Sequence, residues 1–121
     1  MYTPAKITKK IGKDSITFYF GMGAFHMFCE QRKIKLEDIQ SEFEKDQMGS
    51  LVDILYAAAK FDLLVKGEEP KFNRYTAFTW IDQMTDKDLT DIMDTLGNVQ
   101  ILGQGVSGNQ KSPTASRGRK K

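Results

Sequence analysis

Apolar positions change their spacing along the chain, and the first pattern predicts a β element. Residues 15–20 (SITFYF) are β-branched or aromatic apart from the serine, which is typical of a short strand. Residues 5–11 form an earlier strand candidate, and the intervening Gly12, Lys13 and Asp14 would let the two pair as a hairpin. The sequence therefore predicts a small N-terminal β element within residues 5–20.

From residue 22 onward the apolar positions follow helical spacing and predict about five short helices. The first runs from Met22 to near Lys33. The second begins near Leu36 and is amphipathic, with Leu36, Ile39 and Phe43 on one side and Glu37, Asp38, Glu42 and Glu44 on the other.

The third expected helix, at about residues 51–65, is apolar almost all round and is interrupted by only three charged residues. Such a helix must be buried on several sides. Ser50 is its expected N-cap, with Asp53 as the acid of a capping box. Gly67 and Pro70 mark its end.

Two further helices carry capping signals. Asn73 is expected to cap a fourth helix that runs to Met84, and Thr85 with Asp88 forms a capping box for a fifth. The fifth helix extends to Gly97 and has the most regular apolar spacing, at Leu89, Ile92, Met93 and Leu96. The fold class expected is mainly α, with five short helices after a β strand or hairpin.

The last part of the chain has a different composition. Residues 99–102 offer a final turn or strand, whereas residues 103–121 consist mostly of Gly, Ser, Asn, Gln, Pro and basic residues. Such a segment cannot bury enough apolar surface to offset its ordering entropy, so a disordered tail is expected. We therefore expect one helical domain at residues 1–102 and a disordered basic tail at 103–121.

The formal net charge of +2 hides an acidic body between two basic ends. Residues 14–102 hold all 16 acids but nine of the 18 bases, which gives this part a formal charge of −7. A DNA-binding module would draw its affinity from bases that neutralise phosphates. In a helix-turn-helix, the expected fifth helix would be the recognition helix. Its aspartates would repel the DNA phosphates, which argues against that role. A small nucleic-acid-associated regulator that uses its basic ends remains the alternative function.

Three short patterns in the sequence suggest a phosphate, zinc or calcium site. Gly21 and Gly23 lie between a strand and a helix, but the third glycine of a phosphate-binding loop is missing, so a tight turn is the simpler interpretation. His26 and Cys29 lie one turn apart, yet two ligands do not make a zinc site. The aspartates of residues 86–94 lack the spacing of a calcium loop. No catalytic, cofactor or metal site is expected, and the protein is not expected to be an enzyme.

Neither an export signal nor a membrane anchor is visible, and the single cysteine, Cys29, offers no internal disulfide. A cytoplasmic location is therefore expected. The chain also carries many aromatic residues for so small a core, and some of them should remain at the surface as partner contacts. Tyr56, Phe61 and Trp80 are the candidates, with core packing as the alternative for each. Self-association through the same surface is also open.

The order of several segments resembles the tail assembly chaperones of long-tailed bacteriophages. The segments are ITFYFGMGAF at 16–25, LVDILYAAAK at 51–60 and FTWID at 78–82, before a final amphipathic helix. The resemblance implies a non-catalytic protein that binds the long tape-measure protein, keeps it in solution and recruits tail-tube subunits. It also implies action in the host cytoplasm, absence from the mature virion, and in many members a longer form made by translational frameshifting.

Overall fold

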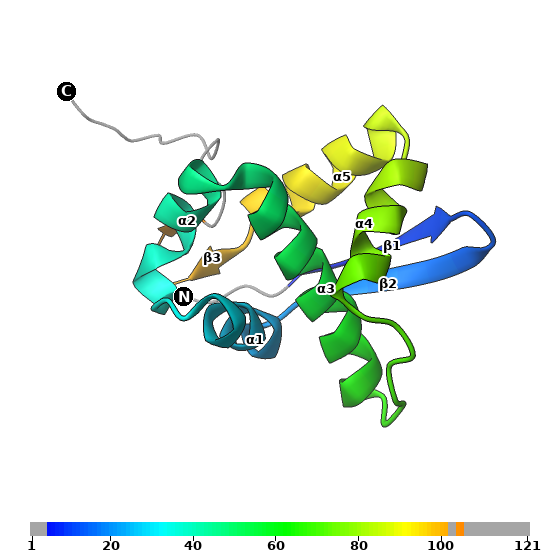
Figure 1. The fold of residues 1–121 in the computed structure, drawn as a ribbon, viewed down its shortest axis with the longest axis horizontal. Coiled ribbons are helices and arrows are strands. Elements are labelled where there is room, and N and C mark those ends of the chain that lie inside the picture. Colours follow the sequence, from blue (N-terminus) through cyan, green and yellow to red (C-terminus); the bar gives the residue numbers. More distant parts are fainter. Residues whose placement is uncertain (1–4, 102–103, 106–121) are drawn as a thin grey trace.

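The computed structural model describes residues 5–101 and 104–105 (Figure 1). Strands β1 (Ala5–Ile11) and β2 (Asp14–Phe20) pair antiparallel, from Ala5 opposite Phe20 to Ile11 opposite Asp14. The expected hairpin is thus confirmed, with a two-residue turn in which Gly12 has a φ of +62°. Glycine takes this left-handed conformation without steric cost, as a tight hairpin turn requires.

Five α-helices follow the hairpin within the described residues, which confirms the expected fold class. They are α1 (Met22–Arg32), α2 (Ile39–Lys45), α3 (Gln47–Val65), α4 (Arg74–Gln83) and α5 (Asp86–Gly97), with a short 3₁₀ helix at Leu36–Asp38 before α2. The expected caps of the last two helices are present. The Asn73 side chain accepts hydrogen bonds from the backbone N–H groups of Tyr75 and Thr76, and the Thr85 hydroxyl accepts one from Asp88.

Helix α3 begins three residues before the expected N-cap. Its N-cap is Asp46, whose carboxylate accepts a hydrogen bond from the Gly49 backbone N–H. Ser50 lies inside the helix, fully buried, and donates its hydroxyl proton to the Glu42 carbonyl. The prediction of Ser50 as N-cap and Asp53 as capping acid was therefore wrong. The predicted end is confirmed, because Gly67 has a φ of +80° and continues into a Schellman-type pattern of hydrogen bonds.

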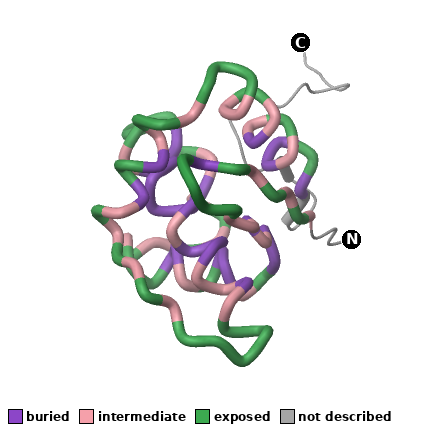
Figure 2. Tube along the Cα trace, turned by 90° about the vertical axis from the view of Figure 1, so that its right-hand side faces the viewer, coloured by how far each residue is buried: buried purple, intermediate pink, exposed green. Residues whose placement is uncertain are grey.

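Helix α3 lies in the middle of the molecule, with α1 and α2 on one side and α4 on the other, and it also packs on β2 (Figure 1). Buried segments gather in the interior, whereas exposed segments lie mostly in the connections (Figure 2). As its all-round apolar sequence predicts, α3 contributes fully buried side chains, and β2 and α1 supply aromatic ones. The largest are Phe18, Phe20, Phe25, Phe28, Ile54 and Leu55.

At the end of the described chain, β3 (Gln100–Ile101) pairs antiparallel with β4 (Gln104–Gly105). The first of these strands falls in the segment where a final turn or strand was expected. The remainder of the predicted disordered tail, at residues 106–121, lies outside the described residues. None of the helices described is both long and apolar enough to cross a membrane.

Candidate functional site

An open pocket of about 620 Å³ lies between α1, α3 and the start of α4. We call it the α1–α3–α4 pocket. Its lining residues combine apolar, aromatic and charged side chains, namely Met27, Glu30, Gln31, Tyr56, Ala57, Lys60, Asn73, Arg74 and Tyr75. A concave surface with an apolar floor and a few polar groups is the usual form of a recognition site.

The aromatic part of this pocket is built by Tyr56 and Tyr75. Tyr56 is half-buried and packs edge to face on Phe72, with ring centroids 6.1 Å apart. Tyr75 follows the Asn73 cap and is 72% exposed, with Phe78 as its stacking neighbour at 6.4 Å. Tyrosines of this kind present an apolar ring and a polar hydroxyl to a partner at small entropic cost.

The charged part of the pocket contains Lys60 and Arg74. The Lys60 Nζ lies 5.5 Å from the centroid of the Tyr56 ring, within range of a cation–π contact. Arg74 is the first residue of α4, and its Nε donates a hydrogen bond to Oδ1 of Asp53. A base at a helix N-terminus is disfavoured by the helix dipole, so its carboxylate partner offsets an unfavourable position.

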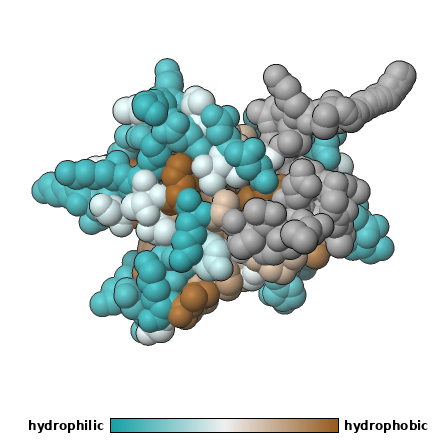
Figure 3. All heavy atoms as spheres, turned by 180° about the vertical axis from the view of Figure 1, so that it is seen from behind, coloured by the Kyte–Doolittle hydropathy of each residue, from teal (hydrophilic) through white to brown (hydrophobic). Residues whose placement is uncertain are grey.

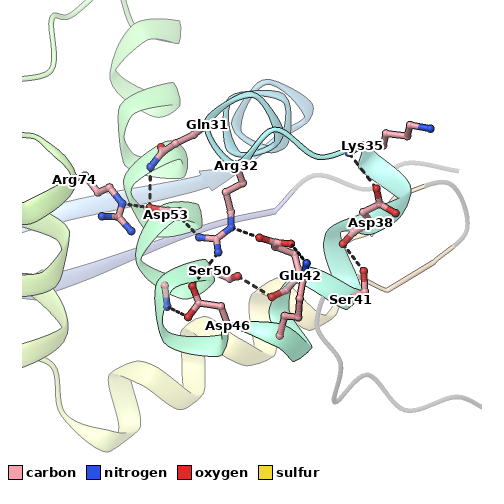
Figure 4. A network of polar contacts seen from close by, with 12 residues as sticks. Gln31, Arg32, Lys35, Asp38, Ser41, Glu42, Asp46, Ser50, Asp53 and Arg74 are labelled. Atoms are coloured by element: carbon pink, nitrogen blue, oxygen red, sulfur yellow. Dashed lines mark hydrogen bonds and ion pairs between the residues drawn. The ribbon is translucent and has the colours of Figure 1, made fainter.

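Behind Arg74 lies a network of ion pairs that joins four helices (Figure 4). Arg32, at the end of α1, donates to Oε2 of Glu42 at 2.7 Å, to Oδ2 of Asp46 at 2.9 Å and to Oδ2 of Asp53 at 2.5 Å. Asp53 is 2% exposed and also accepts from Gln31 at 2.9 Å and from Arg74. Five of these residues line a second, polar pocket of about 330 Å³: Gln31, Arg32, Glu42, Asp53 and Arg74.

The network fixes the charge of its members. Burial alone would lower the pKa of Arg32, but hydrogen bonds to Glu42, Asp46 and Asp53 raise it above its usual range. The Arg32 guanidinium in turn lowers the pKa of Glu42, and together with the Gly49 N–H it lowers the pKa of Asp46. These groups are therefore ionised at neutral pH and hold α1, α2 and α3 in one arrangement.

Sequence reasoning missed this network. It placed Glu42 on a solvated face, whereas Glu42 is buried and paired with Arg32, so that assignment was wrong. Asp53, the predicted capping acid, is likewise a member of the network. The sequence did contain one indication of the network, which is the carboxylate of Asp53 in an otherwise apolar helix. A buried charge requires a partner. The partners themselves come from α1 and α4, and no local pattern identifies them.

Of the three predicted contact residues, only Tyr56 lines the α1–α3–α4 pocket. Trp80 is 6% exposed and packs edge to face on Phe18 at 5.7 Å and on Phe72 at 5.0 Å. Phe61 is partly buried and packs on Tyr19 at 5.0 Å. A role in partner binding stays a prediction for all three, and Trp80 offers a partner the least surface.

Gly21, the N-cap of α1, and Gly23, in the first turn of that helix, make room for the Phe61 ring. Neither Gly21 nor Gly23 has a positive φ, so a left-handed turn is not the reason for glycine here. A Cβ on Gly21 would lie 2.8 Å from the Phe61 ring, and one on Gly23 would lie 2.2 Å from it. The chain does pass from β2, which ends at Phe20, to α1, which begins at Met22, across a single residue, and the glycines also allow the close approach of Phe61 of α3.

The remaining candidates for chemistry, His26, Cys29 and the aspartates of residues 86–94, have ordinary structural surroundings. His26 is exposed and lies 3.5 Å from the Glu30 carboxylate, while burial raises the pKa of the Cys29 thiol. Asp91 pairs with Lys9 of β1 at 2.6 Å. Within residues 5–99, no three His, Cys, Asp or Glu side chains are grouped so as to hold a metal ion.

Searches of family models, of curated proteins and of solved structures found no match to the chain.

Proposed function

We propose that the protein is a non-catalytic tail assembly chaperone of a long-tailed bacteriophage, which binds helical segments of the tape-measure protein in the host cytoplasm. The observation that carries the proposal is the α1–α3–α4 pocket, where half-buried Tyr56 and exposed Tyr75 stand beside charged side chains. An amphipathic helix binds such a surface by placing apolar side chains in the pocket and polar ones at its edge.

Exposed apolar stripes on a very long helix aggregate unless they are covered, which gives such a chaperone its role. The rest of the surface suits this task. Seen from behind, the molecule is mostly hydrophilic, with apolar residues in small separate patches (Figure 3). The formal charge of −7 on residues 14–102 would add solubility to the complex. Recruitment of tail-tube subunits, a longer frameshifted form and absence from the mature virion belong to the same proposal.

Co-expression with the tape-measure protein of the same phage tests the proposal. The chain should keep the tape-measure protein in the soluble fraction and co-purify with it, and residues 1–102 should suppress aggregation about as well as the whole chain. Tyr75→Ser should weaken this effect, because it removes an exposed ring from the pocket. Met48→Ser is the matched control, since Met48 is also exposed but does not line the pocket.

The alternative function would give a different result. If the chain leaves the tape-measure protein insoluble and binds DNA with an affinity that falls steeply with salt, the nucleic-acid role replaces the chaperone role. If Tyr75→Ser and Met48→Ser reduce co-purification equally, binding does not use this pocket.

A further inference from the structure

We propose that the α1–α3–α4 pocket recognises a carboxylate on the bound helix, with Lys60 and Arg74 as the residues that determine this specificity. The inference rests on the proposed function in that the ligand is a helical protein segment. It goes beyond that function by stating which charge the segment must carry beside its apolar face.

The first support is the incomplete pairing of Arg74. Its Nε is bound to Asp53, and its side chain is 36% exposed. The two terminal amino groups make no hydrogen bond or ion pair with any residue that the structure describes. Figure 4 shows these groups on the side of the guanidinium away from Asp53. Two parallel N–H donors on one guanidinium match the two oxygens of a carboxylate.

The second support is Lys60. Its ammonium group has a ring contact with Tyr56 but no carboxylate partner within residues 5–99. Since Lys60 and Arg74 line the same pocket, a ligand in it would meet donors from both α3 and α4. The Lys60 ammonium therefore lies beside the Tyr56 ring, which a partner's apolar side chain could contact.

The acids near the pocket do not cancel this charge. Glu30 is the only carboxylate among its lining residues, and His26 lies beside it on the same helix. Asp53 and Glu42 do not line this pocket, and their oxygens already accept hydrogen bonds from arginine. Lys60 and Arg74 thus place two cations against the carboxylate of Glu30 in this lining, so charge complementarity favours an acidic ligand over a basic one.

The experiment uses two synthetic amphipathic helical peptides of about 20 residues, with the same leucine face. One carries glutamates beside that face and the other carries lysines. We expect the full chain to bind the glutamate peptide roughly tenfold more tightly, which corresponds to about 1.4 kcal/mol. Lys60→Glu should abolish or reverse the preference, and Arg74→Gln should reduce it. Lys10→Glu, which makes the same charge change at an exposed position of β1, should leave the preference intact.

Arg74→Gln also removes a partner of Asp53, so the thermal stability of this variant is measured together with its binding. Lys60→Glu is the decisive variant for carboxylate recognition. Equal binding of the two peptides, binding of neither, or equal effects of Lys60→Glu and Lys10→Glu would overturn the inference. If Lys60→Glu still keeps the tape-measure protein soluble, the proposed function stands and carboxylate recognition fails. If the peptides are discriminated but the tape-measure protein is not bound, the site stands and the proposed function fails.

Discussion

Asp53 is the residue on which the arrangement of helices depends most directly. It lies in the central helix with 2% exposure and accepts hydrogen bonds from Gln31, Arg32 and Arg74, which belong to α1 and α4. Burying a carboxylate is costly unless donors surround it. Here three donors from two other helices do so, and the charge therefore selects one packing of α1 and α4 on α3.

Asp53→Ala should lower the free energy of unfolding by about 3 kcal/mol, because it removes a buried acceptor shared by Gln31, Arg32 and Arg74. The value is at the low end for such changes, since Arg32 keeps Glu42 and Asp46. Urea denaturation of wild type and variant measures it. Asp94→Ala, at an exposed position of α5, should change stability by less than about 0.5 kcal/mol. Equal effects of the two substitutions would show that the network adds no stability.

Single residues also show where sequence reasoning stops. The Asn73 and Thr85 caps were predictable, because each acts within three residues of its own position. The roles of Asp53 and Arg74 were not, since their bond joins positions 21 residues apart. The pattern of the chain indicates that a charge in an apolar helix needs a partner. Only the fold decides which of the available bases supplies it.

At the scale of elements, the closest approach is between the second half of α3 and the start of α1. The Phe61 ring lies against the backbone of Gly21 and Gly23, and it also packs on the ring of Tyr19 in β2. This contact joins three elements around one ring. It also gives a packing reason for glycine at these two positions.

Gly23→Ala should destabilise the protein even though alanine favours helices. The helical gain is at most about 1 kcal/mol, whereas forcing a methyl group into a packed contact typically costs about 1–3 kcal/mol. The new Cβ would lie 2.2 Å from Phe61, so the clash should win. In a Phe61→Ala background the same change should become neutral or stabilising. A double-mutant cycle measured by thermal denaturation checks this, and additive effects would contradict it.

Elements with a strong periodic signal were predicted well, and the boundaries set by tertiary contacts were not. The hairpin, α4 and α5 follow from alternation, turn residues and capping boxes. The start of α3 does not, because Asp46 acts both as its N-cap and as a partner of Arg32 on another helix. The candidate pocket was not predicted, although Tyr56, one of its lining residues, was a candidate partner contact. Its remaining walls come from segments far apart in the sequence.

At the scale of the whole molecule, ion pairs tie together segments that are distant along the chain. Lys9 of β1 binds Asp91 of α5 at 2.6 Å and lies 3.6 Å from Asp88, which attaches the hairpin to the last helix. Arg32 does the same for α1, α2 and α3. Both groups of ion pairs therefore contribute to the tertiary arrangement while their members are charged.

Low pH should therefore destabilise the folded state, because it protonates the carboxylates of these ion pairs. A hydrogen bond from Lys9 lowers the pKa of Asp91, and hydrogen bonds from Arg32 lower those of Glu42 and Asp46. A carboxyl group whose pKa is lower in the folded state stabilises that state above its unfolded pKa of about 4, and the contribution is lost as the pH falls through the folded pKa. Stability should be nearly constant from pH 7 to about 5 and then decrease steadily below about 4.

Urea denaturation across this pH range measures the decrease, and salt separates its sources. Exposed pairs such as Lys87–Asp91 are screened at high ionic strength, whereas the part-buried bonds of Arg32 are screened much less. The loss below about pH 4 should therefore persist in about 0.5 M salt, and Glu42→Gln should make it shallower because one titrating partner of Arg32 is gone. A profile that is flat in acid, or that is abolished by salt, would mean that exposed charges rather than the Arg32 network set the pH dependence.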